Sequence, residues 1–290
     1  MKKSYTTSLE YRGTEFLRSI SRTATKNTHQ RYCFAMDNFF GHFRNRQAED
    51  IHRWDINDYK EERLHEGMAP SSVNLELAII RSFYNWMLER EYVEINPASK
   101  VKRAKVPERK PKGLSRAQVE GLLAQCHSTR DKLIILLPLT TGMRGIELAR
   151  LQWSDIDWEQ NRIVLNGERT KTGRSRTLPL RADVIGLLRE FLTLMDNRPE
   201  EAALEVFSTK DVRNTRAWFT RICRRAGLVP CPGLHSLRHT FASTLLRHGV
   251  DVYTVKELLG HSKLETTAWY LCAADKAEVC KQLDVFPGLP

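Results

Sequence analysis

The sequence predicts a mainly α-helical protein of two domains, with a small antiparallel β-sheet in the second domain. Apolar residues recur at helical spacing through most of the chain, whereas short β-type segments cluster in one region. Because one hydrophobic core tends to stop growing near about 250–300 residues, a chain of 290 residues favours two domains. Residues 98–112 separate them. They carry seven Lys or Arg, two prolines and no apolar periodicity, which is typical of an extended linker.

The first domain, expected over residues 1–101, is all helical. Apolar residues three and four positions apart predict three helices in it. The third helix is expected to begin at Ser71 or Ser72, because a serine side chain accepts hydrogen bonds from the first backbone N–H groups of a helix. The three predicted helices cover residues 28–43, residues 55–66 and residues from 71 to about 88.

The second domain, expected over residues 113–290 after a basic linker of residues 102–112, opens with a capping box of Ser115 and Gln118. A buried helix follows from about residue 131 to Gly142, and a short helix covers residues 144–151. Two of the three β-type segments flank a polar turn, which predicts an antiparallel hairpin. The predicted strands cover residues 156–158, 162–165 and 176–180, and further helices cover residues 184–195, 213–226, 236–248 and 252–259 and start again at 263.

The composition is that of a basic globular protein. The formal net charge is +11, and the isoelectric point is about 9.5. Residues 1–112 hold 21 Lys and Arg against 15 Asp and Glu, and residues 113–290 hold 25 against 20. Since a basic surface attracts polyanions, both domains can contact one long polyanion.

Membrane and metal functions find little support in the sequence. The longest apolar run, residues 133–139, contains Pro138 and is far shorter than the ~20 residues that span a bilayer. The N-terminus lacks the apolar stretch of a secretory signal, so a cytoplasmic protein is expected. None of the six cysteines forms a C-x-x-C pair, which argues against structural zinc and favours reduced thiols.

Polar clusters lie where helices and strands are expected to end, which is where functional side chains are usually exposed. His235 is expected just before a helix that Ser236 caps and that holds Arg238 in its first turn. Both side chains can then face one anion beside the positive end of that helix. Gly260 is expected to end the next helix in a left-handed cap, directly before His261. The five clusters are residues 141–148, 170–173, 235–241, 259–262 and 266–270.

In combination these clusters resemble the conserved boxes of the tyrosine recombinase, or phage integrase, family. The matching segments are RGIEL from Arg144, HSLRHTFA from His235, and LGHS followed by TTAWY, which ends at Tyr270. The segment TKTGRSR, which contains Lys171, resembles the family's β-turn lysine. The resemblance covers about residues 1–285, and the combination is far more specific than any one motif.

The resemblance implies a phosphoryl transfer on DNA without a metal or other cofactor. Tyr270 would attack a DNA phosphate and form a 3′-phosphotyrosyl link with release of a 5′-hydroxyl. Four protomers would exchange strands through a Holliday junction between specific sites in double-stranded DNA. The first domain would be a core-binding, SAM-like, DNA-binding domain, and both domains would form a C-shaped clamp around DNA in the nucleoid.

The residue types suit this chemistry. Arg144 and Arg238 each offer a planar fork of donors for phosphate oxygens, and such electrostatic stabilisation is usually the largest catalytic effect. Lys171 would protonate the leaving 5′-oxygen. His235 would accept the proton of the tyrosine or bond the phosphate, and His261 would donate to a phosphate oxygen. Two further residues are expected to support the catalytic arginines, namely Glu147 beside Arg144 and His239 beside Arg238.

DNA contact is also expected outside the catalytic residues, in the linker and on one later helix. The chain's last residues, 271–290, form an apolar tail, and the resemblance implies that such a tail docks on a neighbouring protomer. Accessory DNA-bending proteins are possible further partners. The residues expected to bind DNA are Lys100, Lys102, Arg103, Lys105, Arg213 and Arg216.

Other interpretations stay open. Lys171 can be a solvated turn lysine, Tyr270 a packed core tyrosine, and Arg144 with Glu147 a surface ion pair. The biological role can be integration and excision of a phage or mobile element, or resolution of chromosome or plasmid dimers. From other classes, a non-catalytic DNA-binding regulator or a metal-dependent nuclease that uses Asp155 and Asp157 can be considered.

Overall fold

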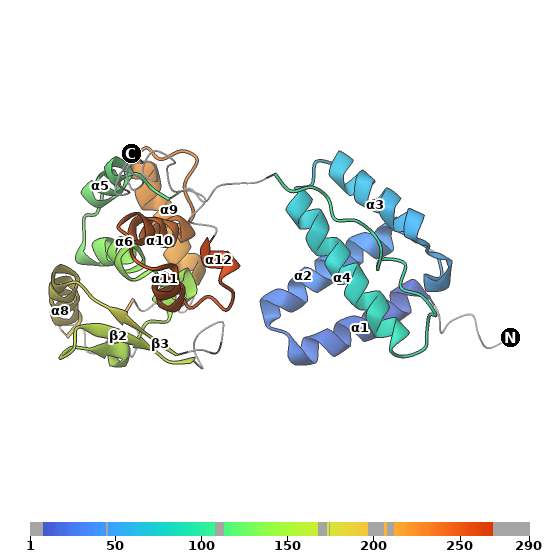
Figure 1. Ribbon diagram of the computed structural model, residues 1–290, viewed down its shortest axis with the longest axis horizontal. Helices are drawn as coiled ribbons and strands as arrows, with labels where there is room; N and C mark the ends of the chain where they lie inside the picture. The colour runs from blue at the N-terminus through green and yellow to red at the C-terminus, as the bar shows by residue number, and fades with distance from the viewer. Residues whose placement is uncertain are drawn as a thin grey trace, which may run out of the picture. The chain divides into compact units, whose positions relative to one another are not determined.

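The protein consists of two compact units, Met1–Glu108 and Arg109–Pro290, in a computed structural model (Figure 1). The structure describes residues 8–44, 46–107, 113–167, 173, 175–196, 206–207 and 212–268. Each unit has its own hydrophobic core. Among the described residues, no helix combines the length and the apolar character that crossing a bilayer requires.

The N-terminal unit packs its helices around α4. Helix α4 contacts α1, α2 and α3, and Figure 1 shows it running across α1 and α2. Phe16 of α1, Phe39 of α2 and Phe83 of α4 are each at most 1% exposed and form the centre of the core. The elements are α1 (Leu9–Thr23), α2 (Lys26–His42), the 3-10 helix η1 (Ala48–Asp50), α3 (Arg53–His65) and α4 (Pro70–Leu88).

Two features of this unit differ from the sequence expectations. Helix α1 was not predicted, although its apolar residues Leu9, Phe16, Leu17 and Ile20 recur at helical spacing and pack in one core. Helix α4 does not begin at Ser71 or Ser72. Its N-cap is Ala69 and Pro70 is its first residue, which suits proline because the first N–H of a helix has no partner within the helix.

The segment that follows α4 is attached to that helix. Arg81 donates from Nε to the carbonyl of Ala98 (3.1 Å) and from Nη2 to that of Val101 (3.1 Å). Asn74 makes two hydrogen bonds to the backbone of Ala104, of 2.9 and 2.7 Å. The chain is therefore held on the N-terminal unit as far as residue 104, beyond the residue 101 expected from the sequence.

The C-terminal unit is built around α6, which contacts α5, α7, α8, α9 and α10. The capping box of Ser115 and Gln118 at the start of α5 is present, as predicted. Gly142 ends α6 with a φ of 68°. The helices are α5 (Arg116–Ala124), α6 (Thr129–Thr141), α7 (Gly145–Ala149), α8 (Ala182–Asp196), α9 (Val212–Arg225), α10 (His235–Arg247), α11 (Val252–Leu259) and α12 (Glu265–Ala268), with the 3-10 helix η2 (Trp153–Asp155).

A three-stranded antiparallel sheet of order β1-β2-β3 completes this unit and confirms the predicted fold class. Its strands are β1 (Ile156–Asp157), β2 (Arg162–Leu165) and β3 (Arg176–Pro179). Ile163 pairs with Leu178, and Leu165 pairs with Arg176. Both members of the first pair are fully buried. Because β3 contacts α11, the sheet is joined to the helices that hold the predicted site.

Candidate active site

Helix α10 supplies three of the predicted side chains, and its start differs from the expectation. The helix begins at His235 itself, and Leu234 is the N-cap without a side-chain cap bond. Ser236 therefore lies inside the first turn and does not cap it. Its buried hydroxyl has no hydrogen-bond partner among the described residues. His235 and Arg238 still lie three residues apart, so they emerge close together at the positive end of the helix.

Arg238 is a buried cation that joins three parts of the chain. Only 1% of the surface of Arg238 is exposed. Nη1 donates to the carbonyl of Gly142 (2.6 Å), and Nη2 donates to the carbonyl of Leu259 (2.7 Å). Nη2 also lies 2.9 Å from Nε2 of His261. The end of α6, the end of α11 and the predicted catalytic histidine are thus held by one guanidinium.

Arg144 is the N-cap residue of α7, and Glu147 binds both its guanidinium and its backbone N–H. Its Nη1 donates to Oε1 of Glu147 (2.9 Å), and its backbone N–H donates to Oε2 (2.6 Å). Its Nη2 donates to the carbonyl of Gly260, 2.9 Å away and 116 residues further along the chain. The side chain of Arg144 is 14% exposed and that of Glu147 is 1% exposed. The pair is therefore part of a buried network and not a surface ion pair.

The C-terminal end of α11 is the acceptor for three arginines. Gly260 ends the helix in the left-handed conformation, with a φ of 64°, as predicted. Three successive carbonyls at this end each accept one guanidinium N–H. The carbonyl of Leu258 accepts from Arg176 (3.0 Å), that of Leu259 from Arg238, and that of Gly260 from Arg144. The last carbonyls of a helix lack partners within it and carry partial negative charge. This end therefore gathers cations around one point.

His261 is fixed at both ring nitrogens. A guanidinium has only donors, so Nε2 accepts from Arg238. Nδ1 then carries the proton and donates to Oγ1 of Thr267, 2.8 Å away. Burial, together with the positive charges of Arg238 and Arg144, lowers the pKa of His261 to about 4. The ring is therefore neutral at neutral pH in the DNA-free protein.

His235 and His239 form a second histidine pair at this place. Their ring centroids are 5.3 Å apart and the rings are nearly perpendicular. Loss of hydration lowers the pKa of His235 to about 4, with smaller contributions from the charges of Arg238 and His239. His235 remains exposed at the surface. A neutral and accessible imidazole is the form that accepts a proton.

The other predicted residues are distributed as follows. Lys171 and Tyr270 lie outside the described residues, as do the side chain of Arg213 and residues 271–290. Arg216 is exposed on α9. Four cations near the linker were predicted to bind DNA. All four are exposed, and none forms an ion pair with a described residue. They are Lys100, Lys102, Arg103 and Lys105.

Two residues of the network were missed by the sequence reasoning. Arg176 was assigned to a strand and ended the TKTGRSR segment without a role of its own, and Thr267 was only part of the TTAWY segment. Arg176 has a side chain 7% exposed and bonds both carboxylate oxygens of Glu147. The only sign of Arg176 in the sequence was a basic residue on a predicted strand next to a polar turn. Such a residue does not reveal that it binds a buried carboxylate.

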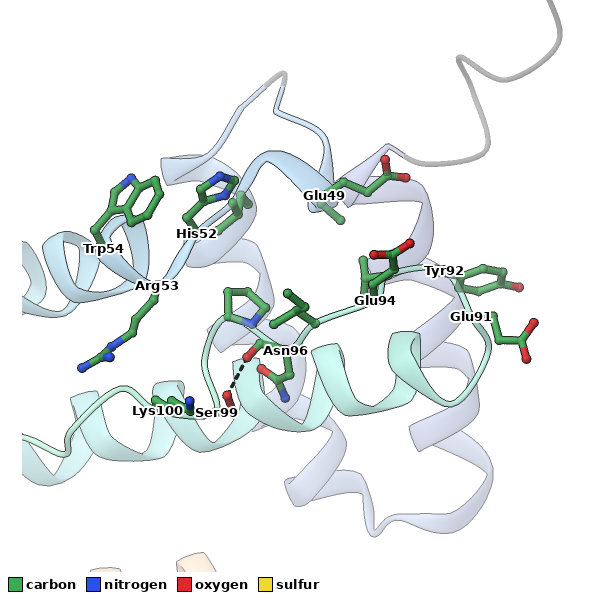
Figure 2. Close-up of a pocket in the computed structure, with 15 residues that line it drawn as sticks. Glu49, His52, Arg53, Trp54, Glu91, Tyr92, Glu94, Asn96, Ser99 and Lys100 are labelled. Atoms are coloured by element: carbon green, nitrogen blue, oxygen red, sulfur yellow. Dashed lines mark hydrogen bonds between the residues drawn. The ribbon is translucent and has the colours of Figure 1, made fainter.

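A hollow in the N-terminal unit is separate from this chemistry. A pocket of about 690 Å³ lies between the start of α3 and residues 91–100. Figure 2 shows Arg53 and Lys100 on one side of it, and Glu91 and Glu94 on the other. The mixed charges favour neither a phosphate nor a cation, and no predicted catalytic residue lines the pocket. In the described part of the chain, no cluster of three or more His, Cys, Asp or Glu is arranged to hold a metal.

Comparison with known proteins agrees with this geometry. Residues 112–277 match the model of the phage integrase family, and residues 13–94 match the N-terminal SAM-like domain of phage integrases. Tyrosine recombinase XerA of Thermococcus onnurineus is 35% identical over 211 residues, which are 71% of this chain and 72% of that protein.

Solved structures share the fold. The Tn1549 transposon integrase, in complex with a circular intermediate DNA, superposes with a TM-score of 0.78 at 15% identity, covering 97% of this chain and 100% of that one. A lambda integrase tetramer bound to a Holliday junction superposes with a TM-score of 0.76 at 17% identity, covering 92% of this chain and 78% of that one.

Proposed function

Because this chain belongs to the phage integrase family of tyrosine recombinases and is a site-specific DNA recombinase, we propose that its strand exchange runs through Tyr270 and the arginine cluster around α11. The carrying observation is the convergence of Arg144, Arg238 and His261, which come from three separate segments, on the end of one helix. Such an arrangement of fixed donors suits a phosphate whose charge grows in the transition state.

The proposed chemistry keeps atoms and charges balanced. The oxygen of Tyr270 attacks the scissile phosphorus while its proton passes to His235, which is neutral and exposed. The bond from phosphorus to the 5′-oxygen breaks, and Lys171 protonates that oxygen. A 5′-hydroxyl of a partner duplex then attacks the same phosphorus and gives its proton to Lys171. The bond from phosphorus to Tyr270 breaks, and His235 returns the proton to the tyrosine oxygen, so one phosphodiester replaces another and no bond energy is lost.

The arginines would take unequal parts. Arg144 is partly exposed and offers its guanidinium to the non-bridging oxygens directly. Arg238 is buried, so it acts on the phosphate through its positive charge. It would contact the phosphate directly only when the groups that cover it move. Donation from His261 to a phosphate oxygen requires Nε2 to gain a proton, since it accepts from Arg238 in the DNA-free protein. Active-site bonds commonly tighten only once substrate is bound.

The two units would divide the work. We propose that residues 1–101 form the core-binding domain, that the basic linker lies along phosphates, and that the catalytic domain of residues 113–290 closes a clamp on the duplex. Exposed cations at Lys100, Lys102, Arg103 and Lys105 support a phosphate contact by the linker. Arg216, with Arg213 on the same helix, would extend it.

Assembly would follow the pattern of the family. We propose a tetramer on two specific DNA sites in the nucleoid, with residues 271–290 docking on the next protomer. Half-buried Leu245, Leu246 and Leu258 on α10 and α11 offer an apolar surface for that tail. Accessory DNA-bending proteins would set the direction of the reaction.

The biological role has two candidates. Integration and excision of a phage or mobile element is the main proposal, and the fold shared with the transposon and lambda integrases fits it. Resolution of chromosome or plasmid dimers is the alternative, which the 35% identity to a Xer recombinase supports. Mapping the genomic DNA that becomes linked to the protein separates the two.

A suicide DNA substrate tests the enzyme assignment. The wild-type protein should form an adduct that survives denaturation and persists in EDTA, whereas Tyr270→Phe should bind DNA normally and form none. Tyr253→Phe is the matched control, because Tyr253 is 60% exposed and lies outside the predicted site. An undiminished adduct in Tyr270→Phe would contradict the proposal, and loss of the adduct in EDTA would favour a metal-dependent nuclease.

A further inference from the structure

Arg176 occupies an unusual position for a strand residue. It is the first residue of β3, and its side chain is only 7% exposed. Nη1 and Nη2 bind the two carboxylate oxygens of Glu147 at 3.0 and 2.6 Å, and Nε binds the carbonyl of Leu258 at 3.0 Å. A bidentate arginine–carboxylate pair with a third bond fixes the orientation of every group involved.

Glu147 is bound by two arginines at once. Its two oxygens take four bonds, two from Arg176 and two from Arg144. Burial raises the pKa of Glu147, but the bonds and charges of Arg176 and Arg144 outweigh burial and hold that pKa below its usual value. The carboxylate is therefore charged and is shared by two guanidiniums.

The sharing changes the charge that Arg144 can offer. Arg144 and Glu147 alone would be a neutral pair, which attracts an anion weakly. With Arg176 the trio carries one net positive charge, so Arg144 keeps its attraction for a phosphate. Lysine at position 176 could supply the charge but not the three directed bonds, because an ammonium is a point charge.

Arg176 also packs against the turn that leads to His261. A Cβ built on Gly260 would lie 3.1 to 3.3 Å from the Nη1, Cδ and Cζ atoms of Arg176. The guanidinium thus rests on the backbone whose carbonyl accepts from Arg144 and whose next residue is His261. The side chain of Arg176 therefore supports both Arg144 and the turn that leads to His261.

We propose that Arg176 is a positioning residue for strand cleavage. It acts through Glu147 and the end of α11 to hold Arg144 and His261 in place and to keep the cluster positive. The proposal rests on the proposed function of Arg144 and His261 at the scissile phosphate. It also joins that cluster to the strand that follows the turn containing Lys171.

Single substitutions separate positioning from folding. Arg176→Gln should cleave a suicide substrate about a hundredfold more slowly, with DNA affinity within about threefold of wild type, because the side chain is buried. Arg176→Lys should recover about tenfold of that loss, since it restores the charge without the fork. Arg162→Gln is the matched control on β2. Its half-exposed ion pair with Asp157 lies in the same sheet, and its cleavage rate should equal that of wild type.

A double-mutant cycle tests the route of the effect. In a Glu147→Gln background, adding Arg176→Gln should slow cleavage by less than about tenfold, because residues that act through each other are not additive. Full additivity would overturn the route through Glu147. Wild-type cleavage by Arg176→Gln, or equal losses of cleavage and DNA affinity, would overturn the positioning role. If Arg176→Gln fails to fold, Arg176→Lys decides, and cleavage at the wild-type rate contradicts the proposal.

Failure of the proposed function gives a different result. In that case wild-type protein forms no adduct at all with the suicide substrate. Failure of the present inference leaves the wild-type adduct intact and abolishes only the difference between the position-176 variants and the Arg162 control.

Discussion

Both units bury a glutamate among polar partners, yet the balance of charge differs between them. In the N-terminal unit Glu76, 4% exposed, binds Asn38, the hydroxyl of Tyr59 and the guanidinium of Arg63. Among the residues that the structure describes, the only cation bound to this carboxylate is Arg63, which also pairs with Glu66. In the C-terminal unit Glu147 meets two cations, and a third, Arg238, binds the same helix end.

The difference distinguishes a structural network from a site prepared for an anion. Around Glu76 no positive charge is in excess among the described side chains, because Arg63 also pairs with Glu66. The hydrogen bonds to Tyr59 and Arg63 fasten α3 to α4. Around Glu147 positive charge is in surplus. Burial is the largest cause of the lowered pKa values of His235 and His261, and the charges of Arg238 and Arg144 act in the same direction. A buried ion pair alone says little about function, so the uncompensated charge is the informative feature.

Loss of Arg144, one of the cations in excess around Glu147, should have the largest effect on the cleavage rate. Arg144→Gln should slow cleavage of a suicide substrate by about 10²–10³, because a fixed donor to the developing charge is lost. The fold should survive, since Glu147 keeps the two bonds of Arg176. Exposed Arg150, just beyond α7, provides the control substitution Arg150→Gln. Equal cleavage rates in the two variants would remove Arg144 from the reaction.

A substitution in the network around Glu76 should change the stability of the protein and not its rate of DNA cleavage. Glu76→Gln should lower the free energy of unfolding by about 3 kcal/mol, because it leaves Arg63 without its buried partner. Urea unfolding measures the loss. Glu62→Gln, which breaks an exposed contact with His42, should cost less than about 1 kcal/mol. A cleavage rate per folded molecule that falls in Glu76→Gln would erase the distinction between the two networks.

The linker cations should contribute a smaller, salt-dependent part. Lys102→Gln and Arg103→Gln should each reduce the slope of log affinity against log salt by about 0.9, the value for one phosphate contact on duplex DNA. Arg116→Gln is the control, because that exposed arginine is already paired with Glu120. Binding assays at several salt concentrations measure the slopes. Three equal slopes would place the linker away from the phosphates.

The burial of His261 beside positive charges also predicts a gradual dependence of stability on pH. His261 has an ordinary pKa of 6.5, lowered to about 4 in the folded protein. Between these values the unfolded chain binds more protons, so stability is complete above pH about 6.5 and falls as the pH drops toward 4. Titration of unfolding should show His261→Gln with a slope smaller by about one proton in this window. An unchanged slope would mean that the histidine is not held neutral.

Local patterns predicted much of this arrangement. Arg144 and Glu147 lie one helical turn apart, so their contact follows from spacing alone. The left-handed cap at Gly260 and the capping box at Ser115 likewise follow from a few neighbouring residues. The hairpin of β2 and β3 was clear from two β-type segments around a polar turn.

The missed features depend on contacts between distant segments. Arg176 meets Glu147 across 29 positions and Leu258 across 82, and no periodicity encodes such pairs. Asn74 and Arg81 hold the start of the linker across 30 and 17 to 20 positions. Helix α1 is a different case, because Leu9, Phe16, Leu17 and Ile20 recur at helical spacing and this local signal was overlooked.

The residue joined to DNA tests the central claim most directly. After reaction with a suicide substrate and digestion with nuclease and trypsin, mass spectrometry should find a nucleotide on the peptide LETTAWYLCAADK of residues 264–276. Fragmentation should place the modification on Tyr270. A nucleotide on any other residue would contradict the assignment of Tyr270 as the nucleophile, with the site around α11 built to activate it.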